Sequence, residues 1–399
     1  MKVSGYTLLL ILLVALAVSQ AWSQQTMSQS SQETSAAPPA IVIGGEPVVT
    51  LTRPPSKNQD KPQFLEAIVA PGRGMNTLQI KAYLPGKGEV ELLDTPPLAQ
   101  VKQLLDEQDD AFGNKNFLVG AAILLPFPNR VTGKLSADGK TIATDIAGKT
   151  VSIPANWHGQ KPGAEVLAMH GLILGKKFDD VHVHNGPEES AVSGTLHAGD
   201  FGGHWLSQSD VQVRTILKDD AIEFSVTVKN VGHEAAPFGI AFHPWYKLLS
   251  GQRAQIRLHV PASERALVNN YDDVVPTGQV EEVKGTPYDF TAPGGAPLDA
   301  LFMDDFFLNL TRDPGGSATV ELTDPAAHYG LRIVGLSREI NGFQVYAPLN
   351  RNVIAIEPQF NLADPYSKVW GTRNTGMAMV QPGQSVVWRV RLELFVPSK

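Results

Sequence analysis

A chain of 399 residues with a formal net charge of −7 and no cysteine has limited options for its function. The acidic balance excludes an extended basic surface that would follow a phosphate backbone, so we expect no nucleic-acid partner. The missing thiols exclude cysteine nucleophiles and thiolate metal sites. Because 43% of the residues are hydrophobic, the chain has enough apolar side chains to bury a large core.

The N-terminus has the pattern of a secretory signal peptide over residues 1–23, with Lys2 followed by an apolar stretch from Tyr6 to Val18. That stretch is shorter than the roughly 20 residues that span a bilayer, which favours export over a permanent anchor and predicts no stable membrane insertion after cleavage. We therefore expect a periplasmic or secreted bacterial protein. Residues 24–40 are polar and of low complexity, which is typical of a flexible leader.

Residues 41–399 contain no comparable linker and are predicted to form a single domain built mainly of strands. An apolar stripe predicts one helix over 97–108. Strict alternation of apolar and polar residues through 211–229, with a Lys-Asp-Asp turn in the middle, predicts a hairpin, and 386–394 alternates in the same way. Such alternation is typical of antiparallel sheets, in which one face packs on the core and the other faces solvent. We predict an all-β fold of two antiparallel sheets packed face to face, with one or few short helices.

Two of the strand-like segments carry a single ionisable residue followed by proline: His243 in "FHPWY" and Glu357 in "IAIEPQ". A glutamate is costly to bury unless it is paired or takes part in chemistry. Alternation places Glu357 on the face opposite its neighbouring isoleucines, and we expect Pro358 to end the strand at a cleft. The alternative interpretations are an exposed strand-end glutamate and a structural histidine without a chemical role.

The aromatic residues after His243 have two interpretations. Trp245 and Tyr246 are of the type that stacks on the apolar faces of sugar rings, which would indicate a carbohydrate site. The same pair could instead pack in the core.

Two further histidines, His182 and His184, would lie on one face of a strand and could begin a metal site with His197 or His204 as a third ligand. No carboxylate or histidine stands at a recognisable metalloenzyme spacing from them. Surface strand histidines are the favoured interpretation, and we assign no metal.

Five segments, taken in order, resemble the aldose 1-epimerase (galactose mutarotase-like) family. Each motif is weak by itself, and the match rests on their order and spacing. The resemblance implies a large antiparallel β-supersandwich that needs no cofactor or metal. The segments are "PFPNR" (126–130), "LAMHG" (167–171), "NVGHEAAPFGIAFHPWY" (230–246), "MDDFFLNL" (303–310) and "IAIEPQFNLADPY" (354–366).

The resemblance also implies an acid–base mechanism. His243 looks like the general acid that protonates the sugar ring oxygen, and Glu357 looks like the general base that takes the proton from the C1 hydroxyl. The two groups would then act from opposite sides of the sugar. Ring opening would give a free aldehyde, and closure after rotation about C1–C2 would give the other anomer.

The remaining matching positions imply substrate binding. Arg130 and His170 resemble residues that bind and orient sugar hydroxyls, and Trp245 would stack on the sugar. Asp304 matches the sugar-binding aspartate of the family, and its neighbour Asp305 is the alternative for the same role.

The leading hypothesis is therefore an exported mutarotase acting on a small-molecule sugar, a free hexose. Two alternatives stay open at this point. One is a carbohydrate-binding protein with the same fold and no catalysis. The other is an epimerase of another sugar derivative, because "HPWY" is similar to a branch that includes hexose-6-phosphate epimerases. Neither the preferred anomer nor the oligomeric state can be read from these motifs.

Overall fold

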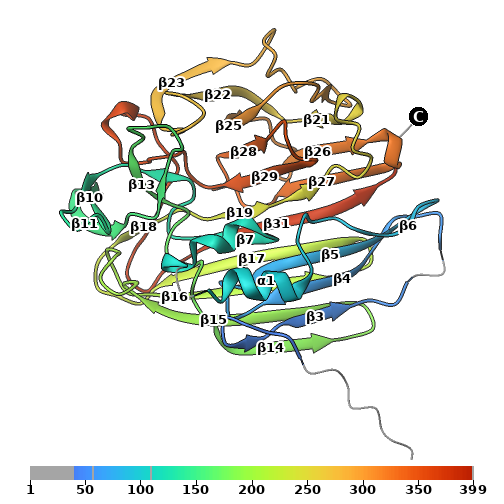
Figure 1. The fold of residues 1–399 in the computed structure, drawn as a ribbon, viewed down its shortest axis with the longest axis horizontal. Coiled ribbons are helices and arrows are strands. Elements are labelled where there is room, and N and C mark those ends of the chain that lie inside the picture. The colour runs from blue at the N-terminus through green and yellow to red at the C-terminus, as the bar shows by residue number, and fades with distance from the viewer. Residues whose placement is uncertain (1–39, 56–57, 108–109, 398–399) are drawn as a thin grey trace, which may run out of the picture. The chain divides into compact units, whose positions relative to one another are not determined.

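Strands dominate the structure, a computed structural model that describes residues 40–55, 58–107 and 110–397 (Figure 1). The predicted signal peptide and all but the last residue of the predicted leader lie outside the described residues. From Ala40 onward the described residues belong to one compact unit. None of the helices in this part of the chain is long and apolar enough to cross a membrane.

The first of the two large sheets has nine strands, and every neighbouring pair in it is antiparallel. Their order across the sheet is β14 (Asp179–Asn185), β15 (Ser190–Gly199), β16 (Ser209–Leu217), β17 (Ala221–Asn230), β31 (Ser385–Phe395), β27 (Tyr329–Gly335), β26 (Ala318–Asp324), β21 (Arg257–His259) and β24 (Ala296–Pro297).

The second large sheet has twelve strands, again with antiparallel neighbours. Ten of them follow one another as β23 (Pro276–Glu282), β22 (Ala262–Val268), β25 (Met303–Leu310), β28 (Gly342–Ala347), β29 (Val353–Gln359), β19 (Ala241–Pro244), β7 (Ala121–Leu124), β5 (Asn76–Leu84), β4 (Gln63–Ala70) and β3 (Val49–Thr52). The other two are short strands outside this order: β20 (Tyr246–Lys247) pairs with β29, and β6 (Gly88–Glu91) pairs with β5.

Small sheets and short helices complete the described chain. The small sheets are β1 (Val42–Ile43) with β2 (Glu46–Pro47); β9 (Lys134–Leu135), β10 (Thr141–Ile146) and β11 (Lys149–Pro154); β8 (Arg130–Val131), β13 (Val166–Met169) and β12 (Trp157–His158); and β18 (Ala236–Phe238) with β30 (Ala378–Val380). The helices are α1 (Leu98–Leu105) and the 3-10 turns η1 (Ala111–Leu118), η2 (Arg253–Gln255), η3 (Pro325–Ala327) and η4 (Lys368–Trp370).

The two large sheets meet through aromatic side chains, and this contact forms the main core. Phe242 of β19 packs on Phe224 of β17, with ring centroids 4.5 Å apart, and on Trp388 of β31 at 6.1 Å. Trp388 is fully buried, and its indole N–H donates to the carbonyl of Pro358 at 3.0 Å. The all-β prediction, with two antiparallel sheets and few short helices, is confirmed.

The local predictions agree with these elements in most places. The predicted hairpin is the β16–β17 pair, and the predicted helix is α1, which ends three residues before the expected boundary. The prediction that Pro358 ends its strand is wrong, because β29 continues to Gln359, which faces Ala241 of β19. The proline is tolerated there because the β19–β29 ladder holds only that one residue pair, so its missing N–H interrupts little pairing.

Candidate active site

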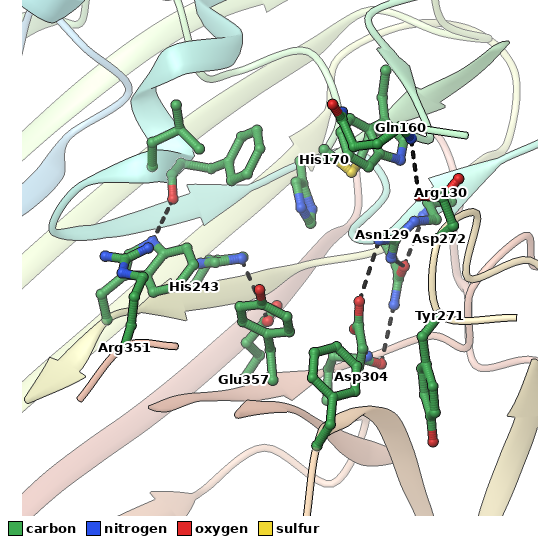
Figure 2. Close-up of a pocket in the computed structure, with 18 residues that line it drawn as sticks. Asn129, Arg130, Gln160, His170, His243, Tyr271, Asp272, Asp304, Arg351 and Glu357 are labelled. Atoms are coloured by element: carbon green, nitrogen blue, oxygen red, sulfur yellow. Dashed lines mark hydrogen bonds and ion pairs between the residues drawn. The ribbon is translucent and has the colours of Figure 1, made fainter. Parts of the chain in front are cut away.

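One pocket of about 450 Å³ gathers residues from both halves of the chain (Figure 2). The segments around β8, β12 and β13 supply one side of its lining, and β19, β25, β28 and β29 of the twelve-stranded sheet supply the other. Six of the seven residues predicted to act in catalysis or binding line this pocket. They are Arg130, His170, His243, Trp245, Asp304 and Glu357.

His243 and Glu357 are neighbours on adjacent strands of the twelve-stranded sheet. Ala241 lies opposite Gln359, and continuing that register along the two antiparallel strands places His243 opposite Glu357. The imidazole Nε2 is 3.5 Å from Glu357 Oε1, while Gln359 Nε2 donates to Oε2 at 3.0 Å. The side chains are only 7% and 2% exposed, so the interpretation of Glu357 as an exposed strand-end residue is wrong.

The same geometry corrects a second expectation. The acid and the base were expected on opposite sides of the sugar, yet both project from the same sheet into the same part of the pocket (Figure 2). The physical reason is the strand pairing: residues that face each other across two antiparallel strands present their side chains on one face. A ligand that contacts both groups must therefore meet them on one wall of the pocket.

Burial sets the protonation of this pair. Burial, with a further contribution from the positive charge of Arg130, lowers the pKa of His243 to about 4. Burial, with a further contribution from the negative charge of Asp304, raises the pKa of Glu357 well above its usual range, although Gln359 and Arg130 oppose this. Both shifts favour the uncharged form: His243 stays neutral down to a pH of about 4, and Glu357 keeps its proton to a higher pH than an ordinary carboxyl does. The two groups lie close enough to exchange a proton.

A closed ring of four polar side chains lies beside the pair (Figure 2). Arg130 donates through Nη1 to Asn129 Oδ1 at 3.0 Å and through Nη2 to Asp304 Oδ2 at 3.3 Å. Gln344 donates to Asp304 Oδ1 at 2.6 Å and accepts from Asn129 Nδ2 at 3.1 Å. Each member holds its neighbours in one orientation, so the ring presents fixed donors and acceptors to a polyhydroxylated ligand.

His170 enters the pocket because the chain turns sharply after β13. His170 and Gly171 both have left-handed backbone conformations, with φ of 62° and 79°, and an added Cβ at Gly171 would lie 2.1 Å from the carbonyl oxygen of Leu125. The imidazole packs on Phe117 at 4.7 Å and edge-on against His243 at 5.1 Å. Burial above all lowers its pKa well below the usual range, and Nδ1 has no hydrogen-bond partner among the described residues.

The two neighbouring aspartates of β25 point in opposite directions. Asp304 lines the pocket, whereas Asp305 does not and is fully buried. Asp305 forms an ion pair with Arg265 and accepts hydrogen bonds from the hydroxyl of Tyr271 at 3.0 Å. Successive residues of a strand face opposite sides, so only one of the two could reach the sugar. The structure brings Asp304 into the site and leaves Asp305 behind it.

Aromatic side chains form much of the remaining lining. Trp245 lies 5.3 Å from the His243 ring, and its indole N–H donates to the carbonyl of Phe117 at 2.6 Å. Tyr246, the other aromatic residue considered for sugar stacking, is fully buried and belongs to the main core cluster.

Several lining residues were missed by the sequence reasoning. Gln344 carried the same signal as Glu357, a polar residue inside an apolar strand, and it lies opposite Glu357 in the β28–β29 ladder. The loop residues had no periodic signal that could have found them. The missed lining residues include Asn129, Trp157, Gln160, Tyr271, Asp272, Phe302, Gln344, Tyr346 and Arg351.

The histidines considered for a metal site lie elsewhere. His182 and His184 are exposed on β14 at one edge of the nine-stranded sheet. His197 contacts the Asp210 carboxylate at 2.8 Å, and His204 contacts the carbonyl of Ser152 at 2.6 Å. Across the described part of the chain, no three or more histidine, aspartate or glutamate side chains are grouped as metal ligands.

Comparisons with known proteins agree with this geometry. The family model described as aldose 1-epimerase matches residues 88–393. A galactose mutarotase-like protein from Clostridium acetobutylicum superposes with a TM-score of 0.67 at 16% identity, covering 90% of this chain and 98% of that chain. An aldose epimerase homologue from C. elegans gives 0.63 at 14% identity, covering 88% and 99%.

A third solved structure, a galactose 1-epimerase from Lactobacillus acidophilus, gives a TM-score of 0.58 at 15% identity and covers 88% of this chain and 99% of that chain. At such identities the superpositions show a shared fold alone. The family model, in contrast, matches well over half of the sequence and includes all the motifs that form the pocket. On that match, the chain belongs to the aldose 1-epimerase family.

Proposed function

We propose that this protein is a mutarotase, an isomerase that interconverts the α and β anomers of a free hexose. The observation that carries the proposal is the buried His243–Glu357 pair, whose Nε2 and Oε1 atoms lie 3.5 Å apart. Anomer exchange needs one group that removes a proton from the C1 hydroxyl and another that donates a proton to the ring oxygen. A pair that shares a single proton can do both and is restored by the reverse step.

The proposed reaction conserves protons at every step. The shared proton first passes from Glu357 to His243, which leaves a carboxylate beside an imidazolium. Glu357 then takes the C1 hydroxyl proton while His243 protonates the ring oxygen, and the bond between C1 and that oxygen breaks to give the open-chain aldehyde. Rotation about C1–C2 presents the other face of the carbonyl. Closure reverses the two transfers and yields the opposite anomer, with the pair again holding one proton.

The charges around the pocket support a neutral sugar as the substrate. Arg130 is paired with Asp304, and Arg351 is paired with Asp94 at 2.8 Å, so each arginine that lines the pocket already has a carboxylate partner. A phosphorylated sugar would have to compete with these carboxylates for both guanidinium groups. Sugar hydroxyls, in contrast, can accept from Arg130 and donate to Asp304 while the ion pair stays in place.

Polarimetry of freshly dissolved α-D-glucose and α-D-galactose tests the proposal. The wild-type protein should accelerate the approach to anomeric equilibrium, and His243→Ala and Glu357→Gln should each lower kcat by about 10² to 10⁴-fold, the usual contribution of a positioned acid or base. Glu321→Gln is the matched control, because Glu321 is a surface strand residue paired with Arg332 outside the pocket. A wild-type protein that binds these sugars in calorimetry without accelerating mutarotation would refute the catalytic proposal and favour the carbohydrate-binding alternative.

We also propose that the protein acts outside the cytoplasm, in the periplasm or after secretion. The support for this is the signal-peptide pattern of residues 1–23, with small residues at Ala21 and Ser23. Mass spectrometry of the protein from the periplasmic and culture fractions should find a mature N-terminus just after one of these two residues. A full-length chain confined to the cytoplasm would contradict the proposal.

A further inference from the structure

A continuous row of four aromatic rings runs along one wall of the pocket. It begins at Trp245, next to His243, and passes to Tyr346 at a centroid separation of 5.7 Å, to Phe302 at 6.0 Å and to Tyr271 at 5.0 Å. Trp245 is 5% exposed and Tyr271 is 40% exposed, so the row leads from the acid–base pair to the mouth of the pocket. Figure 2 shows Tyr271 on the side of the pocket away from His243.

This wall is longer than one sugar ring requires. A six-membered ring with a hydroxyl at each end spans about four bond lengths, or about 6 Å, which is close to one step of the row, whereas the row contains three steps of 5.0 Å or more. The pocket volume leads to the same conclusion. If each of the ~12 non-hydrogen atoms of a hexose displaced one water, at about 30 Å³ each, the sugar would fill at most ~360 Å³. The pocket offers about 450 Å³, which exceeds one hexose but is smaller than two by this measure, so a second unit would extend beyond the mouth.

Tyr271 is exposed and yet held in place from behind. Its hydroxyl donates to the buried Asp305 carboxylate at 3.0 Å and lies 3.0 Å from the hydroxyl of Tyr288. Arg265, the partner of Asp305, stacks over the Tyr288 ring with its Cζ 3.6 Å from the centroid. The hydroxyl end of Tyr271 is therefore anchored in a polar cluster around the buried Asp305, while its ring remains open to the pocket.

The loop that carries Tyr271 is tied to the opposite side of the pocket as well. The carboxylate of Asp272 accepts hydrogen bonds from the backbone N–H groups of Gln160 at 2.9 Å and Lys161 at 3.0 Å. An exposed aromatic ring that is fixed on both sides loses little conformational freedom when a ligand stacks on it. Such a ring is a prepared binding surface, and Gln160 and Asp272, which also line the pocket, add polar groups beside it.

We propose that Tyr271 and Phe302 form a second sugar-binding subsite, which holds the unit next to the reducing end of a neutral oligosaccharide. The inference rests on the proposed function, because it places the reducing-end ring against the His243–Glu357 pair. The preferred substrate is then a disaccharide or longer oligosaccharide with a free anomeric carbon, and a free hexose fills only the inner part of the pocket. Binding energy from the outer unit helps to orient the reacting ring.

Polarimetry with freshly dissolved maltose, cellobiose and lactose, each compared with glucose, tests the subsite. In the wild type at least one disaccharide should have a higher kcat/KM than glucose. Tyr271→Ala should lower the ratio of kcat/KM for that disaccharide to kcat/KM for glucose by about tenfold, the effect of an aromatic contact worth ~1.4 kcal/mol. Tyr83→Ala is the matched control, because Tyr83 is a partly exposed tyrosine of β5 outside the pocket, and it should leave the ratio unchanged.

Two further variants keep the test decisive if Tyr271→Ala does not fold. Phe302→Ala should lower the same ratio, and Tyr271→Phe, which keeps the ring and removes its anchoring hydroxyl, should lower it less than Tyr271→Ala. A wild-type ratio at or below one for all three disaccharides would overturn the subsite while leaving the mutarotase proposal intact. So would a ratio that none of these variants changes.

Failure of the proposed function gives a different result. If the wild type accelerates mutarotation of none of these sugars, calorimetry with the same disaccharides and glucose replaces the kinetic readout. Tighter binding of a disaccharide than of glucose, lost in Tyr271→Ala or Phe302→Ala and kept in Tyr83→Ala, would support the subsite on a binding protein. Equal or weaker binding of every disaccharide would overturn it.

Discussion

The depressed pKa of His243 should make the stability of the folded protein depend on pH in one defined direction. The folded protein keeps His243 neutral down to a pH of about 4, whereas the unfolded chain protonates the same side chain near its ordinary value of 6.5. Between these two values the unfolded state binds a proton that the folded state does not. The free energy of unfolding should therefore fall as the pH is lowered from 6.5 to about 4.

The magnitude follows from the same two values. At about 1.4 kcal/mol per pH unit, a pKa lowered from 6.5 to about 4 corresponds to a loss of about 3 kcal/mol across the window. His170 is buried nearby and also has a lowered pKa, so the wild-type curve by itself would mix the two histidines. Subtracting the His243→Gln curve removes the surface carboxylates, because both proteins contain them. It also removes the part of the His170 titration that does not depend on His243, while the lowering of the His170 pKa by the charge of His243 stays in the difference.

Urea denaturation at a series of pH values, followed by tryptophan fluorescence, gives the required free energies. The free energy of unfolding of the wild type minus that of His243→Gln should be constant above pH 6.5. It should decrease by about 3 kcal/mol as the pH approaches about 4. A difference that stays constant through the window would refute the reasoning. His243 would then take up its proton near its ordinary pKa of 6.5, as in the unfolded chain.

Three further outcomes follow from the geometry of the site. In a pH–rate profile by polarimetry, kcat/KM should decrease at pH values below about 4, because His243 is then protonated and can no longer accept a proton. A decrease that begins near pH 6.5 would contradict this. Asp304→Asn should raise KM for glucose about tenfold and should also lower Tm, because the buried Arg130 loses its carboxylate partner. Asp305→Asn leaves Arg265 paired with Glu281 and should leave KM for glucose unchanged; an equal rise in KM for both variants in steady-state kinetics would refute the assignment. Gly171→Ala should lower Tm and weaken sugar binding in calorimetry, because its Cβ would lie 2.1 Å from the Leu125 oxygen and displace His170. An unchanged affinity would show that this turn does not position the sugar-binding residues.

Elements with a strong local period could be predicted, and the reason is physical. In β16, β17 and β31, side chains alternate between the core and the other face. Apolar residues are therefore needed at every second position, which gives the sequence a period of two. β29 has no such alternation because it is buried along its whole length, and its end was misplaced at Pro358. Periodicity reports contrast between two faces, and a strand covered on both faces offers none.

Within the site, the residue types were evident from the sequence while their arrangement was not. A single ionisable residue inside an apolar segment drew attention to His243 and Glu357, while Arg130 and His170 were indicated only by the resemblance to the family. Their separations in the sequence exceed a hundred residues in places, and only the pairing of β19 with β29 brings the imidazole to 3.5 Å from the carboxyl. Whether the two groups faced each other across a sugar or shared one wall depended on that pairing.

The amino-acid sequence by itself determined the all-β class, the hairpin and the single short α-helix. These features depend on local side-chain pattern and residue type. Only the tertiary structure decided that Asp304 faces the pocket and Asp305 faces Arg265, and that loop residues such as Tyr271 extend the aromatic wall to the mouth. These outcomes depend on which segments meet after the sheets have packed, and contacts between distant segments leave no periodic trace in the sequence.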